Sequence, residues 1–315
     1  MVTIPWYPGG TAVSCRSRPL VAVLDVIQTP AFQQRFFFLA KRFIAGETAD
    51  QAMDAVAEIN AQGMSATLDF LGEDVTVRAE ADRTRDAYFE LLDAIRARGV
   101  DTNVSVKLTA MGLLIDNELA LENLRAVVER ASNNHDPFVR IDMEGSAVTD
   151  ATLDVFERLY ADTKNVGPVL QAYLRRTPAD VEHAIALGAR VRLCKGAYNE
   201  LPDIAYKDMP SIRSHYMRCA EALLERGNYP GIATHDERVI LAVETFVRER
   251  AIARDRFEFQ LLYGVRPELQ RRLVSEGYRV RIYVPYGTHW AGYFYRRITE
   301  RKENVIFALR SMLQR

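Results

Sequence analysis

Two adjacent arginines, Arg296 and Arg297, are the residues whose type and spacing most clearly suggest chemistry. In a helix they would share a face with Tyr293 and Glu300, because positions three, four and seven apart lie on one side. A planar guanidinium group donates two parallel hydrogen bonds, so such a pair suits a carboxylate or a phosphate. A solvated basic stripe would give the same pattern, and this helix alone favours that interpretation. The elements that position the helix must decide between the two.

The helix follows a strand at residues 279–284, and the same strand–helix unit repeats along the chain. Further strands are predicted near residues 66–70, 103–108, 138–143, 168–173, 189–194, 231–234 and 257–261. Helices are predicted after them, including 116–132, 178–187, 211–226, 237–250 and 267–276. Such units, over about 250 residues, predict an α/β protein with a (β/α)8 TIM-type barrel. The alternative is an open doubly wound sheet, which normally carries a G-x-G-x-x-G turn that this sequence lacks.

No composition shift divides the chain into separate domains. Residues 1–18 are predicted to be a poorly ordered arm, residues 19–63 N-terminal helices, and residues 64–315 the catalytic barrel. In this interpretation the helix of Arg296 and Arg297 follows the last strand and covers the active site.

Period-two alternation indicates which strand residues point into the barrel. The polar residues of several strands share a parity, and the last of each set stands where barrel enzymes build their active sites, at the carboxyl ends of the strands. These residues are Lys107, Asp142, Gln171, Gln260 and Tyr283. Arg140 and Arg281 precede them and are predicted to form internal ion pairs with a structural role.

Two further segments at the same end carry polar residues. Lys195 falls outside the alternation of its strand, so it is predicted to lie in a turn with Gly196 and Ala197. A glycine-containing turn can present backbone N–H groups to an anion, although the motif is weak alone. His235 follows Thr234 at the end of a strand, where a ligand role and a structural role are equally open.

The bulk composition excludes several classes of protein. The 315 residues are 48% hydrophobic and 26% charged, with a net charge of −1, so the basic excess of nucleic-acid-binding proteins is missing. Three cysteines without metal-ligand spacing favour reduced thiols in the cytoplasm. No secretory signal and no apolar run of about 20 residues occur, so we expect a soluble protein, with peripheral membrane contact left open.

The predicted site can hold an anionic substrate but contains no redox centre of its own. No metal site with enough ligands and no serine–histidine or cysteine–histidine nucleophile pattern is present. The site therefore uses Lys107 as a Schiff base, as aldolase-like barrels do, or borrows a cofactor. A third hypothesis is a non-catalytic barrel that only binds an amino acid.

Several segments together resemble the proline dehydrogenase family. They are VSVKLTAMG (104–112), RIDMEG (140–145), VLQAYLRR (169–176), RLCKGAY (192–198), ATHD (233–236), FEFQLLYG (257–264) and the segment 281–297, which begins RIYVPYGTHW and ends YFYRR. The resemblance covers about residues 60 to 310 in family order, and RLCKGAY and the double-arginine segment are its most specific parts. The length fits the monofunctional bacterial members of the family. The bifunctional members, with a fused aldehyde dehydrogenase, would need several hundred more residues.

The resemblance implies an FAD-dependent enzyme that oxidises L-proline to 1-pyrroline-5-carboxylate by hydride transfer to FAD. This is the first step of proline catabolism, and the family passes the electrons to a membrane quinone. The resemblance thus implies a cytoplasmic protein that visits the inner face of the membrane.

The resemblance also implies roles for individual residues. Lys107, Arg296 and Arg297 would bind the substrate carboxylate, and Tyr283 and Tyr293 would wall the proline ring. Asp142 and Tyr198 stand where the family has its catalytic acidic residue and tyrosine. The flavin would be held by Met143, Gln171, Arg192, Lys195, Gly196, Ala197, Thr234, His235 and Gln260.

Three details qualify this transfer. The assignment of Tyr293 depends on aligning the chain at Arg296 and Arg297, because the loop before it is shorter than in the bifunctional enzymes. Asn199 stands where those enzymes have tryptophan, which affects the local flavin contacts. Tyr283 favours unsubstituted proline, because relatives acting on hydroxyproline carry a smaller residue there.

Overall fold

The strands form a closed parallel barrel in chain order, each hydrogen-bonded to the next and the last to the first. The structure, a computed structural model, describes residues 40–299, with side chains as far as residue 294. The strands are β1 (Ser65–Phe70), β2 (Thr102–Lys107), β3 (Val139–Asp142), β4 (Val166–Gln171), β5 (Arg192–Cys194), β6 (Gly231–Ala233), β7 (Glu258–Leu262) and β8 (Val280–Tyr286). The predicted (β/α)8 fold is therefore confirmed.

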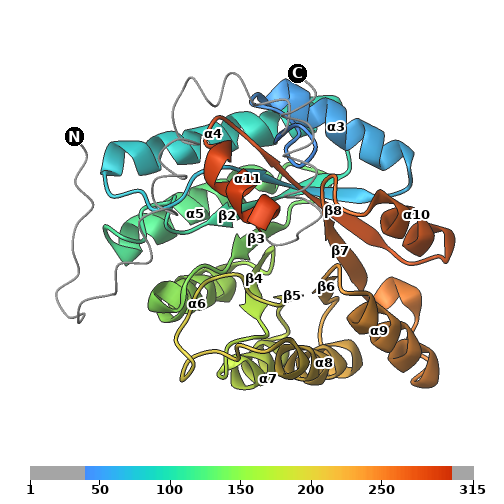
Figure 1. The fold of residues 1–315 in the computed structure, drawn as a ribbon. Coiled ribbons are helices and arrows are strands. Elements are labelled where there is room, and N and C mark those ends of the chain that lie inside the picture. The colour runs from blue at the N-terminus through green and yellow to red at the C-terminus, as the bar shows by residue number, and fades with distance from the viewer. Residues whose placement is uncertain (1–39, 300–315) are drawn as a thin grey trace. The chain divides into compact units, whose positions relative to one another are not determined.

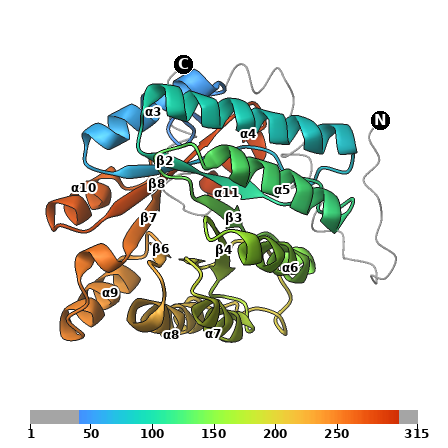
Figure 2. The same cartoon turned by 180° about the vertical axis from the view of Figure 1, so that it is seen from behind.

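Helices alternate with the strands and enclose the barrel, as Figures 1 and 2 show from opposite sides. They are α3 (Ala49–Ala61), α4 (Arg78–Arg98), α5 (Asn117–Ala131), α6 (Ser146–Asp162), α7 (Thr177–Leu187), α8 (Met209–Arg226), α9 (Glu237–Glu249), the 3-10 helix η1 (Arg254–Arg256) and α10 (Pro267–Ser275). Side-chain caps start several of these helices, because a carboxylate or hydroxyl satisfies an otherwise unpaired N–H group. Asp116, Asp208 and Asp236 accept such bonds at the starts of α5, α8 and α9.

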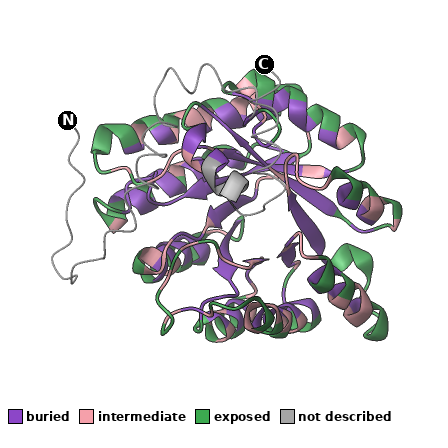
Figure 3. Cartoon of the chain, viewed as in Figure 1, coloured by how far each residue is buried: buried purple, intermediate pink, exposed green. Residues whose placement is uncertain are grey.

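The main core lies between the barrel and its helices. Leu68, Val104 and Val106 of the first strands and Leu91 and Leu124 of the helices are fully buried there. Figure 3 shows the same division, with buried strands at the centre and exposed residues on the outer faces of the helices. Because the apolar residues of each strand face the helices, the alternate polar residues face the barrel interior.

The last strand is longer than the sequence predicted. The predicted strand ended at residue 284, before Pro285, but β8 continues to Tyr286 and Pro285 pairs in register with Asp69 of β1. Pairing between β7 and β8 ends at Tyr283, so the missing N–H group of Pro285 interrupts no bond to β7. The Pro285 carbonyl instead accepts the Ala45 amide at 3.0 Å.

The described chain divides into two units by its contacts. Residues 42–288 form the barrel unit, and the described residues 40–41 and 289–299 belong to the other unit. In the second unit the structure describes α11 (Trp290–Thr299), in which the Trp290 and Phe294 rings meet edge to face with centroids 5.8 Å apart. The predicted boundaries at residues 18 and 63, and the predicted covering role of this helix, stay predictions.

Candidate active site

Lys107 and Asp69 form a buried ion pair at the carboxyl ends of β1 and β2. The lysine Nζ lies 2.8 and 2.7 Å from the two carboxylate oxygens, and Asp69 is 0% exposed. Burial alone would lower the pKa of Lys107, but the carboxylates of Asp69 and Asp142 raise it above its usual range. Burial raises the pKa of Asp69, and Lys107 opposes that rise. The pair therefore holds an ammonium cation in the mouth of the barrel.

Asp142 of β3 is the centre of a second cluster beside this pair. One of its oxygens accepts hydrogen bonds from Ser105 Oγ and Arg192 Nη1, both at 2.7 Å. Its other oxygen accepts the Tyr283 hydroxyl at 2.9 Å. Burial, followed by the charge of Asp142, raises the pKa of Tyr283 well above its usual value, so this phenol stays protonated and donates. Side chains from three other strands, β2, β5 and β8, thus donate to one carboxylate.

A chain of polar contacts continues from this cluster down the barrel. Arg192 Nε donates to Gln260 Oε1, and Gln260 Nε2 donates to Glu258 at 2.6 Å. Arg281 Nε donates to the same carboxylate at 2.8 Å, and Arg281 also pairs with Asp136 at 3.3 Å. The predicted structural ion pairs of Arg281 are confirmed.

The prediction that Arg140 forms an ion pair is wrong. Its guanidinium donates to the backbone carbonyls of Pro168, at 3.1 Å, and of Arg190. Burial, together with the charges of Arg192 and Arg190, lowers the pKa of Arg140 well below its usual value. Backbone carbonyls satisfy the donors of this guanidinium where a carboxylate was expected.

The turn after β5 carries a charged cluster of its own. Lys195 Nζ and Arg213 Nε of α8 both donate to Asp236, the residue that caps α9, the second at 2.6 Å. Burial would raise the pKa of Asp236, but Lys195 and Arg213 outweigh it and lower that pKa to about 2. Gly196 follows with a φ of +103°, and a Cβ there would meet the Tyr173 ring at 2.1 Å. Only glycine fits this turn, which the sequence placed correctly.

The other predicted flavin contacts lie along the same rim. Gln171 Nε2 donates to the Glu144 carbonyl at 2.8 Å. Met143, which precedes Glu144 in the sequence, is buried. Thr234 Oγ1 accepts the Asp236 amide at 3.1 Å, and His235 Nε2 accepts the Leu262 amide at 3.1 Å. These residues therefore lie at the carboxyl ends of the strands, as predicted, whereas their roles in flavin binding stay predictions.

Tyr198 belongs to the loop after β5 and approaches the end of β3. A Cβ built on Gly145 would lie 3.9 Å from Tyr198 Cδ1, so the ring passes directly beside that turn. Glu200 secures the loop, because its two oxygens accept the amide of Ser146 at 2.7 Å and its hydroxyl at 2.5 Å. The tyrosine is thus held near the strand that carries Asp142.

The remaining predicted residues belong to the second unit. Tyr293 lies in α11, and Arg296 and Arg297 fall within the same helix as predicted. The side chains of Arg296 and Arg297 lie outside the described part of the structure. The structure thus brings together Asp142, Gln260, Arg192 and Tyr283, with Lys107 opposite Asp142 on the neighbouring strand, and their relation to the residues of α11 stays a prediction.

Asp69 and Glu144 are the site residues that the sequence analysis missed. Asp69 has the inward parity of Thr67 on a correctly predicted strand, so period-two alternation could have found it. Glu144 lies two residues beyond Asp142, past the end of β3, where alternation no longer applies. Its burial at 4% exposure marks it only once the fold is known.

The Schiff-base alternative can be tested against this geometry. A Schiff-base lysine must reach its neutral form to attack a carbonyl, whereas the carboxylates around Lys107 stabilise its cation. Among the described residues no histidine, cysteine or carboxylate cluster could hold a metal ion. The site as described favours binding of an anion by fixed cations.

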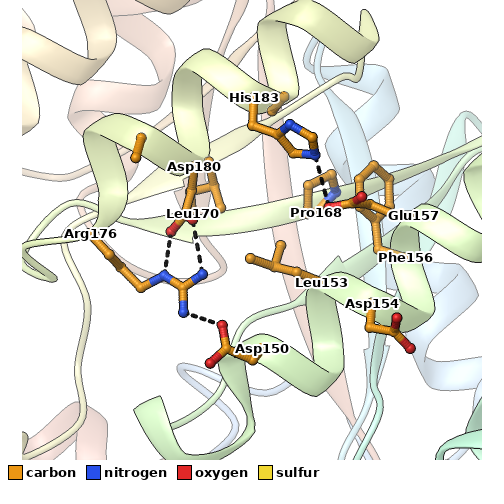
Figure 4. Close-up of a pocket in the computed structure, with 12 residues that line it drawn as sticks. Asp150, Leu153, Asp154, Phe156, Glu157, Pro168, Leu170, Arg176, Asp180 and His183 are labelled. Carbon is orange, nitrogen blue, oxygen red and sulfur yellow. Dashed lines mark hydrogen bonds and ion pairs between the residues drawn. The ribbon is translucent and has the colours of Figure 1, made fainter.

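Two cavities elsewhere in the barrel unit contain none of the predicted site residues. One of about 460 Å³ lies between α6 and α7, where Arg176 bridges Asp150 and Asp180 and His183 meets Glu157, as Figure 4 shows. The other, of about 650 Å³, is lined by residues at the amino ends of the strands, including Arg190 and Arg279. The carboxyl ends carry the convergent charged groups, so they form the candidate active site.

Comparison of the sequence with known proteins identifies similar proteins and a matching family. The model of the family described as proline dehydrogenase matches residues 52–310. The chain is 40% identical over 276 residues to proline dehydrogenase 1 of Bacillus subtilis subsp. natto, covering 88% of this chain and 91% of that protein. It is 39% identical over 302 residues to a proline dehydrogenase of Deinococcus radiodurans, covering 93% and 97%.

A solved structure shows the same fold. Proline utilization A from Bdellovibrio bacteriovorus, inactivated by N-propargylglycine, matches with a TM-score of 0.76 and 29% sequence identity over 82% of this chain. This chain spans 32% of that longer protein. The barrel, the charged cluster at its mouth and these similarities agree, and the chain belongs to the proline dehydrogenase family.

Proposed function

We propose that the protein is an FAD-dependent proline dehydrogenase, which oxidises L-proline to 1-pyrroline-5-carboxylate in the first step of proline catabolism. Its family membership supports proline oxidation. The observation that carries the proposal is the buried Lys107–Asp69 ion pair in the mouth of the barrel, next to the Asp142 cluster. A fixed cation beside fixed hydrogen-bond donors is what an amino-acid substrate with a carboxylate requires.

Lys107 retains binding capacity for a carboxylate despite its pairing with Asp69. An ammonium group has three donors, and Asp69 receives two contacts from it. We assign the substrate carboxylate to Lys107 with Arg296 and Arg297, and the walls of the ring pocket to Tyr283 and Tyr293. Positioning by several such contacts can lower a barrier by about 7–11 kcal/mol when the alignment is ideal.

Asp142 and Tyr198 are the proposed catalytic residues. The substrate amine must be neutral before C5 can lose a hydride, because an ammonium nitrogen has no lone pair to form the C=N bond. Asp142 is positioned to interact with a cationic amine or imine, and Arg192, Ser105 and Tyr283 fix its orientation. The protein therefore contributes orientation and charge at the reacting ring.

The side chains at the ends of β4 to β7 fit a flavin. A flavin ring and its diphosphate present mainly acceptors and negative charge, and the predicted set offers the amides of Gln171 and Gln260 and the cations of Arg192 and Lys195. We assign Met143, Gly196, Ala197, Thr234 and His235 to the same site. Bound FAD supplies the acceptor for the hydride that leaves C5 of proline.

The proposed electron acceptor is a quinone, which gives the enzyme a reason to contact a membrane surface. The described part of the chain contains no helix long and apolar enough to cross a membrane. We propose a cytoplasmic protein that docks peripherally at the inner face of the membrane to be reoxidised.

An anaerobic titration tests this function. The purified protein should be yellow, absorbing at about 450 nm, and L-proline should bleach it, whereas D-proline should not. A colourless protein that traps substrate covalently on borohydride treatment would instead support the Schiff-base hypothesis. Bleaching by another amine or acid, but not by L-proline, would refute the substrate assignment.

A further inference from the structure

Glu144 is a buried carboxylate that the proposed reaction does not use. It follows Asp142 and Met143 at the carboxyl end of β3 and is 4% exposed. Within the described residues no lysine or arginine forms an ion pair with it. A buried carboxylate without a counter-ion is costly and persists only with hydrogen bonds that satisfy it. Its partners therefore indicate what it does.

Thr109 supplies those hydrogen bonds. The Thr109 amide donates to Glu144 Oε1 at 3.2 Å, and the Thr109 hydroxyl donates to Oε2 at 2.6 Å. Thr109 lies two residues after Lys107, at the point where β2 ends. The carboxylate thus fixes the chain that leaves Lys107, and both of its oxygens act as acceptors.

The connection after β1 is attached to the same threonine. The Asp74 amide donates to Thr109 Oγ1 at 3.0 Å, and the Val75 amide donates to the Thr109 carbonyl at 3.2 Å. Asp74 has a φ of +60°, an uncommon conformation for a residue with a side chain, and these bonds help hold it there. This connection begins just after Asp69, so Thr109 joins the ends of the two strands that carry the ion pair.

We propose that Glu144 is a positioning residue for the Asp69–Lys107 pair, and that its carboxylate, acting through Thr109, fixes the carboxyl ends of β1, β2 and β3 relative to one another. This inference rests on the proposed function, because Lys107 is assigned there to the substrate carboxylate. Gln171 adds a fourth strand, since its amide donates to the Glu144 carbonyl at 2.8 Å. A small shift in this network moves the cation that orients the substrate.

The network depends on the charge of Glu144. Thr109 donates to both oxygens of the Glu144 carboxylate, so a proton on either oxygen weakens one of these two hydrogen bonds. Burial raises the pKa of Glu144 to about 7, and the negative charge of Glu73 adds to this rise. The hydrogen bonds from Thr109 and the positive charge of Lys107 oppose it. The fixed arrangement therefore forms as the pH rises through about 7.

Glu144→Gln is the first test. It keeps the size of the side chain, but an amide has one acceptor oxygen and leaves one Thr109 donor unpaired. We expect kcat/KM for L-proline to fall about 10-fold to 100-fold with flavin content unchanged, because misplacing a binding group by about 1 Å costs that much. The inflection near pH 7 in the wild-type kcat/KM profile should disappear in this variant.

Thr109 variants give a second test that does not depend on Glu144. Thr109→Val should behave like Glu144→Gln, whereas Thr109→Ser keeps the hydroxyl and should retain the wild-type values. Thr152→Val is the matched control, because Thr152 is fully buried and its hydroxyl has no hydrogen-bond partner among the described residues. This control should leave kcat, KM and the pH profile unchanged.

Hydrogen exchange separates this inference from the proposed function. The amides of residues 72–77 should exchange about 10-fold faster in Glu144→Gln and Thr109→Val, whether or not L-proline is the substrate. Wild-type exchange there, with a wild-type pH profile in both variants, would overturn the positioning role. Faster exchange together with a flavin that L-proline never bleaches would support the network and refute the proposed function.

Discussion

Lys107 and Asp69 show how a single charge is kept in place at the mouth of the barrel. Sequence alternation gives the direction of Lys107, but not its partner, because the partner lies on another strand. Pairing of β1 with β2, with Asp69 opposite Ser105, brings the aspartate within reach of the lysine. The ion pair is thus a product of strand order and register, which a single sequence does not state.

Asp69→Asn tests how much this ion pair contributes to the free energy of unfolding. The change leaves the Lys107 ammonium buried without its carboxylate, and breaking a buried ion pair costs about 3–5 kcal/mol of unfolding free energy. Urea unfolding measures the loss. The double variant Asp69→Asn with Lys107→Met removes the unpaired charge and should recover part of it. Equal stability of Asp69→Asn and the wild type would show that solvent or another group replaces the carboxylate.

At the scale of elements, the sequence predicts strands better than contacts. Period-two alternation correctly gave the inward direction of Asp142, Gln260 and Tyr283, because that period follows from strand geometry alone. The ion pair predicted for Arg140 was wrong, because its guanidinium binds backbone carbonyls, and carbonyl positions depend on how the strands pair. The limit of sequence reasoning here is the pairing of strands, since only register decides which charges meet.

Asp236 joins two roles at one element boundary, since it caps α9 and pairs with Lys195 and Arg213. Its pKa is lowered to about 2, so its ion pairs stabilise the fold above the usual aspartate pKa, and this stability is lost as the pH falls towards 2. Asp236→Asn keeps a capping side chain but removes the charge. We expect a loss of about 1 kcal/mol near pH 7, after allowing for the partly exposed partners.

Urea unfolding of Asp236→Asn at neutral and acidic pH checks this prediction. The difference from the wild type should shrink between about pH 4 and about pH 2, because both proteins then lack the charge. Asp116→Asn is the control, since Asp116 caps α5 through the Glu118 amide and forms no ion pair among the described residues. A pH-independent difference for Asp236→Asn would assign its effect to capping alone.

At the scale of the barrel, Arg281 ties together strands from both ends of the sequence. From β8 it donates to Glu258 of β7 at 2.8 Å and to the Ala66 carbonyl of β1 at 2.7 Å. Burial would raise the pKa of Glu258, but Arg281 outweighs it and lowers that pKa. The stabilising contribution of Glu258 is therefore present above the usual glutamate pKa and is lost as the pH falls below it.

Glu258→Gln should lower the unfolding free energy by about 3–5 kcal/mol near pH 7, because the Arg281 guanidinium loses a buried carboxylate. Acidification should reduce the difference from the wild type, since Glu258 becomes protonated as the pH falls through its lowered pKa. Thermal unfolding followed by circular dichroism measures both values. An undiminished difference at low pH would show that side-chain packing, rather than charge, explains the loss.

Closure of the barrel by β1 and β8 has a consequence for how the chain reaches its native state. The Arg281 guanidinium and the Ala66 carbonyl that it binds are 215 residues apart in the chain, so this seam cannot form until most of the protein has been synthesised. Contacts between such distant segments form slowly, because loop closure must precede any gain from pairing. Pulse-labelled hydrogen exchange should therefore find the β1 and β8 amides protected last, after an intermediate with an open sheet. Such an intermediate exposes two unpaired strand edges, which makes chaperone dependence during synthesis an expected property of this fold.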